Sequence, residues 1–154
     1  MPLLECGFPG GGDYSASDSL TNIGPTLFVD IGFDTGVNYA ALSHGAQLLS
    51  QATGVPALLD TGAAESCIDD SLARSINLPI IDRVMVSGVG GATEVNVYLA
   101  HIVVPAIGYI QWGRFAGALL TNGGQVHRAL IGRTLLRDVL VVYDGREGKV
   151  KLAY

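Results

Sequence analysis

A short apolar run that stops at an acidic turn narrows the possible folds of this chain more than any other feature. Val55 to Leu59 is apolar without interruption, and Asp60-Thr61-Gly62 follows it directly. A continuous apolar run of this length, bounded by turn residues, is typical of a buried strand. The sequence therefore predicts a buried strand that ends in a turn carrying a carboxylate.

Short strands are expected through much of the remaining sequence. β-Branched, aromatic or alternating apolar residues occur at Thr26 to Phe33, Val84 to Leu99, His101 to Val104, Tyr109 to Leu120, Val139 to Tyr143 and Lys149 to Leu152. Short helices are expected over residues 69–76 and 134–138, and a short helix or an ordered insertion over 38–52. The chain is therefore predicted to be mainly β, with two or three small helices.

Residues 1–22 differ in composition from the rest. They combine three consecutive glycines, Gly10 to Gly12, with serine and aspartate, and they offer few apolar side chains for burial. Such a segment is expected to form a flexible N-terminal arm. Residues 23–154 have the length of one ordinary domain, so we predict an arm followed by a single domain.

Composition and charge argue against several classes of partner. Apolar residues make up 49% of the chain and charged residues only 15%, as in a compact fold. The formal net charge of -5, without a Lys/Arg cluster, argues against nucleic acid and against an anionic membrane surface. No apolar run approaches the roughly 20 residues of a membrane-spanning helix. Residues 1–12 lack the pattern of a signal peptide, so a cytoplasmic protein is expected.

Other reactive residue types form no recognisable site. The three histidines have no spacing suited to a shared metal. Cys6 and Cys67 lack the paired spacing of a zinc or redox motif. The sequence contains no Gly-x-Ser-x-Gly elbow, and the glycine-rich stretch 88–91 lacks the lysine of a phosphate loop. Neither a metal nor an organic cofactor is therefore expected.

The stretch from Ala57 to Ser66 reads Ala-Leu-Leu-Asp-Thr-Gly-Ala-Ala-Glu-Ser. It resembles the active-site loop of aspartic proteases, especially the single-lobe retropepsin-like kind. The resemblance implies that Asp60 is the catalytic residue and that Ala63 is the small residue supporting the loop. Thr61 would hold the loop by a side-chain hydrogen bond, and Gly62 would let the backbone approach the substrate closely.

A second Asp-Thr-Gly, at Asp34 to Gly36, lacks this context. Asp34 follows Gly32-Phe33 instead of an unbroken apolar strand, so we interpret it as a turn residue. It lies only 26 positions (60 minus 34) before Asp60. That distance is too short to build a second lobe between the two.

Two further segments resemble parts of the same family, in the family order. Ile131-Gly132-Arg133, with the apolar residues on either side, resembles the segment and helix that cross under the active-site loop. The hairpin from Val84 to Leu99 corresponds to the flap that folds over bound peptide. Its mobile, substrate-contacting tip would consist of Ser87, Gly88, Val89, Gly90 and Gly91. Without the family order, the same glycines would also suit a plain surface hairpin, although less well than a flap.

The chain also departs from the family pattern. Where many retropepsins have acidic residues after the small residue of the loop, this sequence has Ala64 and then Glu65. Glu65 is therefore the candidate partner for Arg133. The insertion over residues 36–54 is longer than the corresponding turn in viral enzymes.

The resemblance implies a retropepsin-like lobe that is active as a homodimer. Each copy would supply Asp60, and two facing carboxylates would share one proton because like charges oppose double ionisation. One carboxylate would activate a water and the other would polarise the scissile carbonyl of an extended peptide or protein substrate.

Two alternatives to this interpretation remain open. A dimeric peptide-binding module could use the same fold and groove without catalysis. Residues 1–22 could also occupy the cleft and be removed by self-cleavage, because a loose arm rich in glycine and serine is easily threaded.

Overall fold

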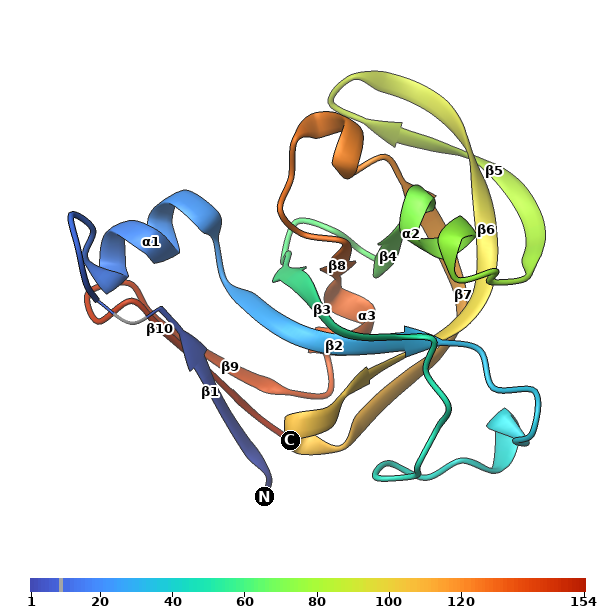
Figure 1. Ribbon diagram of the computed structural model, residues 1–154, viewed down its shortest axis with the longest axis horizontal. Helices are drawn as coiled ribbons and strands as arrows, with labels where there is room; N and C mark the ends of the chain where they lie inside the picture. The colour runs from blue at the N-terminus through green and yellow to red at the C-terminus, as the bar shows by residue number, and fades with distance from the viewer. Residues whose placement is uncertain (9) are drawn as a thin grey trace.

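The computed structural model describes residues 1–8 and 10–154 and is built mainly from strands (Figure 1). The strands are β1 (Leu3–Gly7), β2 (Thr26–Gly32), β3 (Ala52–Leu59), β4 (Cys67–Asp69), β5 (Ile80–Gly88), β6 (Gly91–Val104), β7 (Tyr109–Ala118), β8 (Ala129–Ile131), β9 (Leu140–Asp144) and β10 (Lys149–Ala153). The helices are α1 (Ala16–Ile23), α2 (Asp70–Ser75) and α3 (Arg133–Leu136), with single 3-10 turns η1 (Tyr39–Ala41), η2 (Pro105–Ile107) and η3 (Thr121–Gly123). The expectation of a mainly β fold with short helices is confirmed.

The strands form a large sheet that folds back on itself and a small separate sheet. The large sheet has the order β2-β3-β8-β4-β7-β6-β5, and β2 also pairs with β6. The small sheet has the order β1-β10-β9. In Figure 1 the small sheet lies on one side of the molecule, and the β5–β6 hairpin projects from the other.

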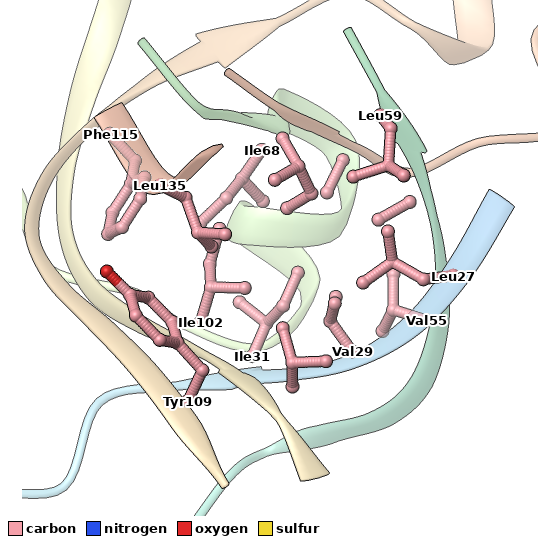
Figure 2. Packing of buried hydrophobic residues seen from close by; sticks show 14 of the residues in the cluster. Leu27, Val29, Ile31, Val55, Leu59, Ile68, Ile102, Tyr109, Phe115 and Leu135 are labelled. Atoms are coloured by element: carbon pink, nitrogen blue, oxygen red, sulfur yellow. The ribbon is translucent and has the colours of Figure 1, made fainter. Parts of the chain in front are cut away.

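A single apolar core lies inside the folded sheet. Figure 2 shows side chains from β2, β3, β6 and β7 converging there with Ile68 and Leu135. Ile31, Ile68, Ile102, Ile131 and Leu135 are completely buried. Burial of each aliphatic side chain contributes on the order of 2 kcal/mol to the stability of the fold. The strands around the candidate site are therefore anchored in a well-packed core.

The structure corrects the expectation of a loose arm over residues 1–22. β1 pairs antiparallel with β10, from Leu3 opposite Ala153 to Gly7 opposite Lys149. α1 begins with a capping box in which Ser15 and Asp18 satisfy each other's backbone N–H groups. The hydroxyl of Ser17 also donates to the carbonyl of Gly145, in the turn between β9 and β10. Both ends of this segment are therefore packed against the body of the protein.

The segment 38–52 contains less helix than the sequence suggests. Only the 3-10 turn η1 forms, and β3 already begins at Ala52. The segment is held by side chains: Asp34 accepts the N–H of Leu49, and His101 lies between Tyr39 and Ser50. It is an ordered insertion because these contacts replace helical hydrogen bonds. Among the described residues, no helix combines the length and apolar character needed to cross a membrane.

Candidate active site

Asp60 stands at the end of the buried strand β3, as the sequence predicts. β3 pairs in parallel with β8, with Leu59 opposite Ile131. The N–H of Asp60 donates to the carbonyl of Ile131 at 3.0 Å. The parallel pairing continues to the last residue of the strand, so the position of Asp60 is fixed by the core beneath it.

The carboxylate of Asp60 is half-buried and oriented by its own loop. Its Oδ1 accepts the N–H of Gly62 at 2.8 Å and that of Ala63 at 3.3 Å. A Cβ on Gly62 would lie 3.0 Å from this oxygen, so a residue without a side chain suits the turn. Oδ2 accepts no hydrogen bond from the described residues, which leaves it available to an external donor.

The side chain of Thr61 makes no hydrogen bond to the described residues that would explain a loop-supporting role within one copy. Its side chain is exposed, and its hydroxyl makes no hydrogen bond within residues 1–8 and 10–154. The expected side-chain hydrogen bond is therefore absent from the described part of a single chain.

The start of α3 is tied to the back of the active-site loop through its backbone. The N–H groups of Arg133 and Thr134 donate to the carbonyls of Ala63 and Ala64, each at 3.0 Å. The first N–H groups of a helix have no partner inside the helix. The loop supplies partners for two of them, so helix and loop are held as one unit.

Ser66 and Gly132 form the second tie between the same segments. The N–H of Gly132 donates to the buried Ser66 hydroxyl at 3.1 Å, and this hydroxyl donates to Oε1 of Gln111 at 2.9 Å. A Cβ on Gly132 would lie 2.5 Å from the carbonyl carbon and oxygen of Glu65. Close packing therefore requires glycine at position 132. The sequence indicates Ser66 as a position of the loop but carries no signal for Gln111.

The structure corrects the expected pairing of Arg133 with Glu65. The Arg133 guanidinium instead donates to the carbonyls of Thr61 and Gly62, at 2.7 and 3.0 Å. Among the described residues, no ion pair joins Arg133 to Glu65. Arg133 therefore supports the loop through backbone carbonyls and leaves the Glu65 carboxylate free of it.

Cys67 follows the loop and is not suited to act as a nucleophile. Burial is the main cause that raises the pKa of its thiol to about 11, with smaller contributions from Asp60 and Asp69. The thiolate, not the thiol, is the reactive form. Cys67 is therefore a neutral packing residue at neutral pH.

Asp34 lies away from the active-site loop, and both of its carboxylate oxygens already accept hydrogen bonds. Its two oxygens accept the N–H groups of Gly36 and Leu49, each at 2.8 Å, and these bonds, led by that from Leu49, lower its pKa. β2 and β3 are antiparallel, with Thr26 opposite Leu58, so Asp34 and Asp60 follow opposite ends of the pair. β2 has seven residues, which at about 3.3 Å each separates the two carboxylates by more than about 20 Å.

The hairpin predicted as a flap is present as β5 and β6. Pairing continues to Gly88 opposite Gly91, so Val89 and Gly90 form the turn, and Val89 is fully exposed. Gly91 has a φ of 103°, a conformation that favours glycine. Ser87 lines a hollow between this hairpin and the active-site loop, together with Glu65 and Arg114. The tip residues themselves project into solvent.

This geometry agrees with the comparison with known families. Residues 47–135, more than half of the chain, match a family model described as aspartyl protease. The chain belongs to the aspartyl protease family. The matched region of this aspartyl protease contains Asp60, the β5–β6 hairpin and Ile131 to Arg133.

Solved structures similar to this aspartyl protease include two viral proteases. One is the EIAV protease complexed with the inhibitor HBY-793, which is 21% identical over 74% of this chain and 86% of the viral chain, with a TM-score of 0.48. Another is the solution structure of simian foamy virus (mac) protease, 13% identical over 73% and 92% of the two chains, with a TM-score of 0.44. No curated protein matches this chain in sequence.

Proposed function

We propose that the protein is an aspartic endopeptidase whose active site is completed when two copies pair, each supplying Asp60. The observation that carries the proposal is the state of this carboxylate. Oδ1 is held by two N–H groups, while Oδ2 accepts no hydrogen bond from the described residues. An oriented carboxylate with one open oxygen is suited to bind a water or a second carboxylate.

The second carboxylate has to come from another molecule. Asp34 is the other Asp-Thr-Gly residue, and both of its oxygens are engaged at the opposite end of the β2–β3 pair. Two copies related by a two-fold axis would bring the same loop together from each side. The Thr61 hydroxyl, exposed and without a partner among the described residues, would then face its twin and bond across the axis.

The paired carboxylates would divide the acid and base work. Because like charges oppose double ionisation, the pair would hold one proton. The ionised carboxylate would take a proton from a water as its oxygen attacks the scissile carbonyl carbon, and the protonated one would give its proton to the carbonyl oxygen. Breakdown of the resulting diol breaks the C–N bond: the leaving nitrogen takes a proton from the carboxylate that the water protonated, and a diol hydroxyl gives its proton to the other carboxylate, which restores the singly protonated pair.

The test is digestion of casein at acidic and neutral pH by wild type, Asp60→Asn and Asp34→Asn. We expect Asp60→Asn to lose at least about a thousandfold in kcat/KM, because a neutral amide cannot act as the base. Asp34→Asn is the matched control, since it makes the same chemical change in the same tripeptide. Cleavage that survives in Asp60→Asn would contradict the role of Asp60, whereas a wild type that binds peptide without cleaving it would leave a peptide-binding module as the better description.

Mixing experiments test whether the site is shared. When wild type is mixed with an equal amount of Asp60→Asn and allowed to exchange partners, about a quarter of the dimers should keep two Asp60 residues. Activity per wild-type chain should therefore fall to about half. Activity per wild-type chain that is unchanged after exchange, or an active species that sediments as a monomer, would contradict the shared site.

A further inference from the structure

Glu65 is an acidic residue beside the active-site loop that the proposed reaction does not use. Its side chain is exposed, and its backbone is packed against Gly132. Seven ion pairs occur among the described residues, and none of them includes Glu65. A rigid backbone therefore holds an uncompensated carboxylate five positions after Asp60.

This carboxylate lines a groove under the β5–β6 hairpin. A hollow of about 420 Å³ lies between Glu65 and the inner side of the hairpin, where Val84, Met85, Val86 and Val97 supply apolar walls. A second hollow of about 190 Å³ extends past Ser66 toward Thr134. Glu65 and Arg114 line both hollows, so the two lie next to each other, between the hairpin and α3, and are together called the groove below.

The charge of the groove is set by Glu65. Arg114, the other charged residue that lines it, forms an ion pair with Asp82 on β5. The Arg114 hydrogen bond is the main cause that lowers the pKa of Asp82, so this carboxyl stays ionised and neutralises the guanidinium. When Asp82 is counted with Glu65 and Arg114, the charges at and beside the groove sum to minus one, next to apolar walls.

We propose that this groove receives a lysine or arginine side chain of the substrate, with Glu65 as the acceptor of its positive charge. The long methylene stem of such a side chain suits the apolar walls while its charged end reaches the carboxylate. This inference rests on the proposed function and deepens it by naming the substrate class. It makes Glu65 a specificity-determining residue for peptides with a basic side chain near the cleaved bond.

The first test is digestion of a peptide library, followed by matched peptides that carry lysine or norleucine at the preferred position. We expect wild type to favour the lysine peptide by about fivefold in kcat/KM, an effect of the size seen for exposed ion pairs. Glu65→Gln should lower kcat/KM for the lysine peptide to the value for the norleucine peptide, and raising the salt concentration should weaken the wild-type preference. Glu147→Gln is the control, because it makes the same charge change in the exposed turn after β9.

The outcomes separate this inference from the proposed function. Cleavage that requires Asp60 but shows no lysine or arginine preference, or a preference that survives in Glu65→Gln, would overturn the role of Glu65 alone. If wild type cleaves nothing, binding of the same peptides to Asp60→Asn decides the question. Tighter binding of the lysine peptide that depends on Glu65 would support the subsite, and equal binding of both peptides would overturn it.

Discussion

Gly132 lets the segment before α3 pack against the active-site loop because it lacks a side chain. Its φ of -88° suits any residue, so its backbone conformation does not require glycine. The requirement comes from the Glu65 carbonyl group, which would lie 2.5 Å from an added Cβ. Contact with rigid backbone cannot be relieved by a rotamer change.

Gly132→Ala should therefore displace the active-site loop from α3. We expect a loss of about 1–3 kcal/mol in the free energy of unfolding, the usual range for overpacking, together with a loss of activity. Urea denaturation and casein digestion would measure the two effects. Gly123→Ala is the matched control, because an added Cβ there meets nothing within 4 Å. Equal stability of the two variants would contradict the packing argument.

At the residue scale, hydrogen bonds between a side chain and backbone carbonyl groups are the hardest contacts to predict from sequence. The place of Asp60 after a strand is predictable because an apolar run leads directly into it, and β3 confirms that strand. The partners of Arg133 are not predictable, because the carbonyl groups of Thr61 and Gly62 leave no mark in a sequence. The sequence offers Glu65 as a charged partner for Arg133, but Glu65 has no ion pair among the described residues.

At the scale of elements, β1 shows what local composition cannot reveal. Its residues look like part of a loose arm, yet they pair with β10, more than 140 positions later in the sequence. Such long-range pairing is invisible to a reading of neighbouring residues. A local signal did exist in the Ser15-x-x-Asp18 pattern, which caps α1. Self-cleavage of this segment is not favoured, since both β1 and α1 are packed on β10 and its turn.

The ladder between β1 and β10 offers a test with a matched control. The N–H of Phe8 donates to Gly148 and that of Tyr154 to Pro2, so the alternation of an antiparallel pair turns the N–H of Cys6 toward β10. The N–H of Glu5 then faces the free edge. Cys6→Pro should lower the free energy of unfolding by at least about 2 kcal/mol, whereas Glu5→Pro should cost less than about 1 kcal/mol.

Thermal and urea denaturation of the two proline variants would measure the difference. Val150 and Leu152 of β10 are part of the core. Loss of the β1–β10 pairing should therefore weaken the core, and activity should fall together with stability. If both variants were as stable as wild type, β1 would be dispensable and the expectation of a loose arm would be restored.

At the scale of the whole molecule, two buried histidines couple folding to pH. The Tyr39 hydroxyl, which accepts the N–H of Asp34, lies 2.8 Å from Nδ1 of His101, and the Ser50 hydroxyl lies 2.8 Å from Nε2 of the same ring. Thr26 donates to Gly24, so it accepts from Nε2 of His127. Nδ1 of His127 has no partner among the described residues, so a second proton on this ring would have no acceptor there.

Acidification should destabilise the fold before its carboxylates are protonated. Burial is the main cause that lowers the pKa of His101 and of His127 below the ordinary 6.5. The unfolded chain then binds protons more readily, so the stability from each ring is complete above pH 6.5 and is lost as pH falls through the folded pKa. Asp69 and Asp70 do not contribute to this loss of stability between pH 7 and pH 5. Burial alone would raise the pKa of each carboxyl, but hydrogen bonds outweigh it and lower both pKa values below 3.8.

The free energy of unfolding should therefore fall between pH 7 and pH 5, with a contribution from each buried histidine. Urea denaturation of Asp60→Asn would measure it without self-digestion or titration of the site. Adding His127→Gln should lower stability at pH 7 yet reduce the difference between the two pH values, since one titrating ring is gone. An aspartic protease of this fold would thus meet opposing demands, because the acid that supplies the proton of a carboxylate dyad also charges two rings that the core holds neutral.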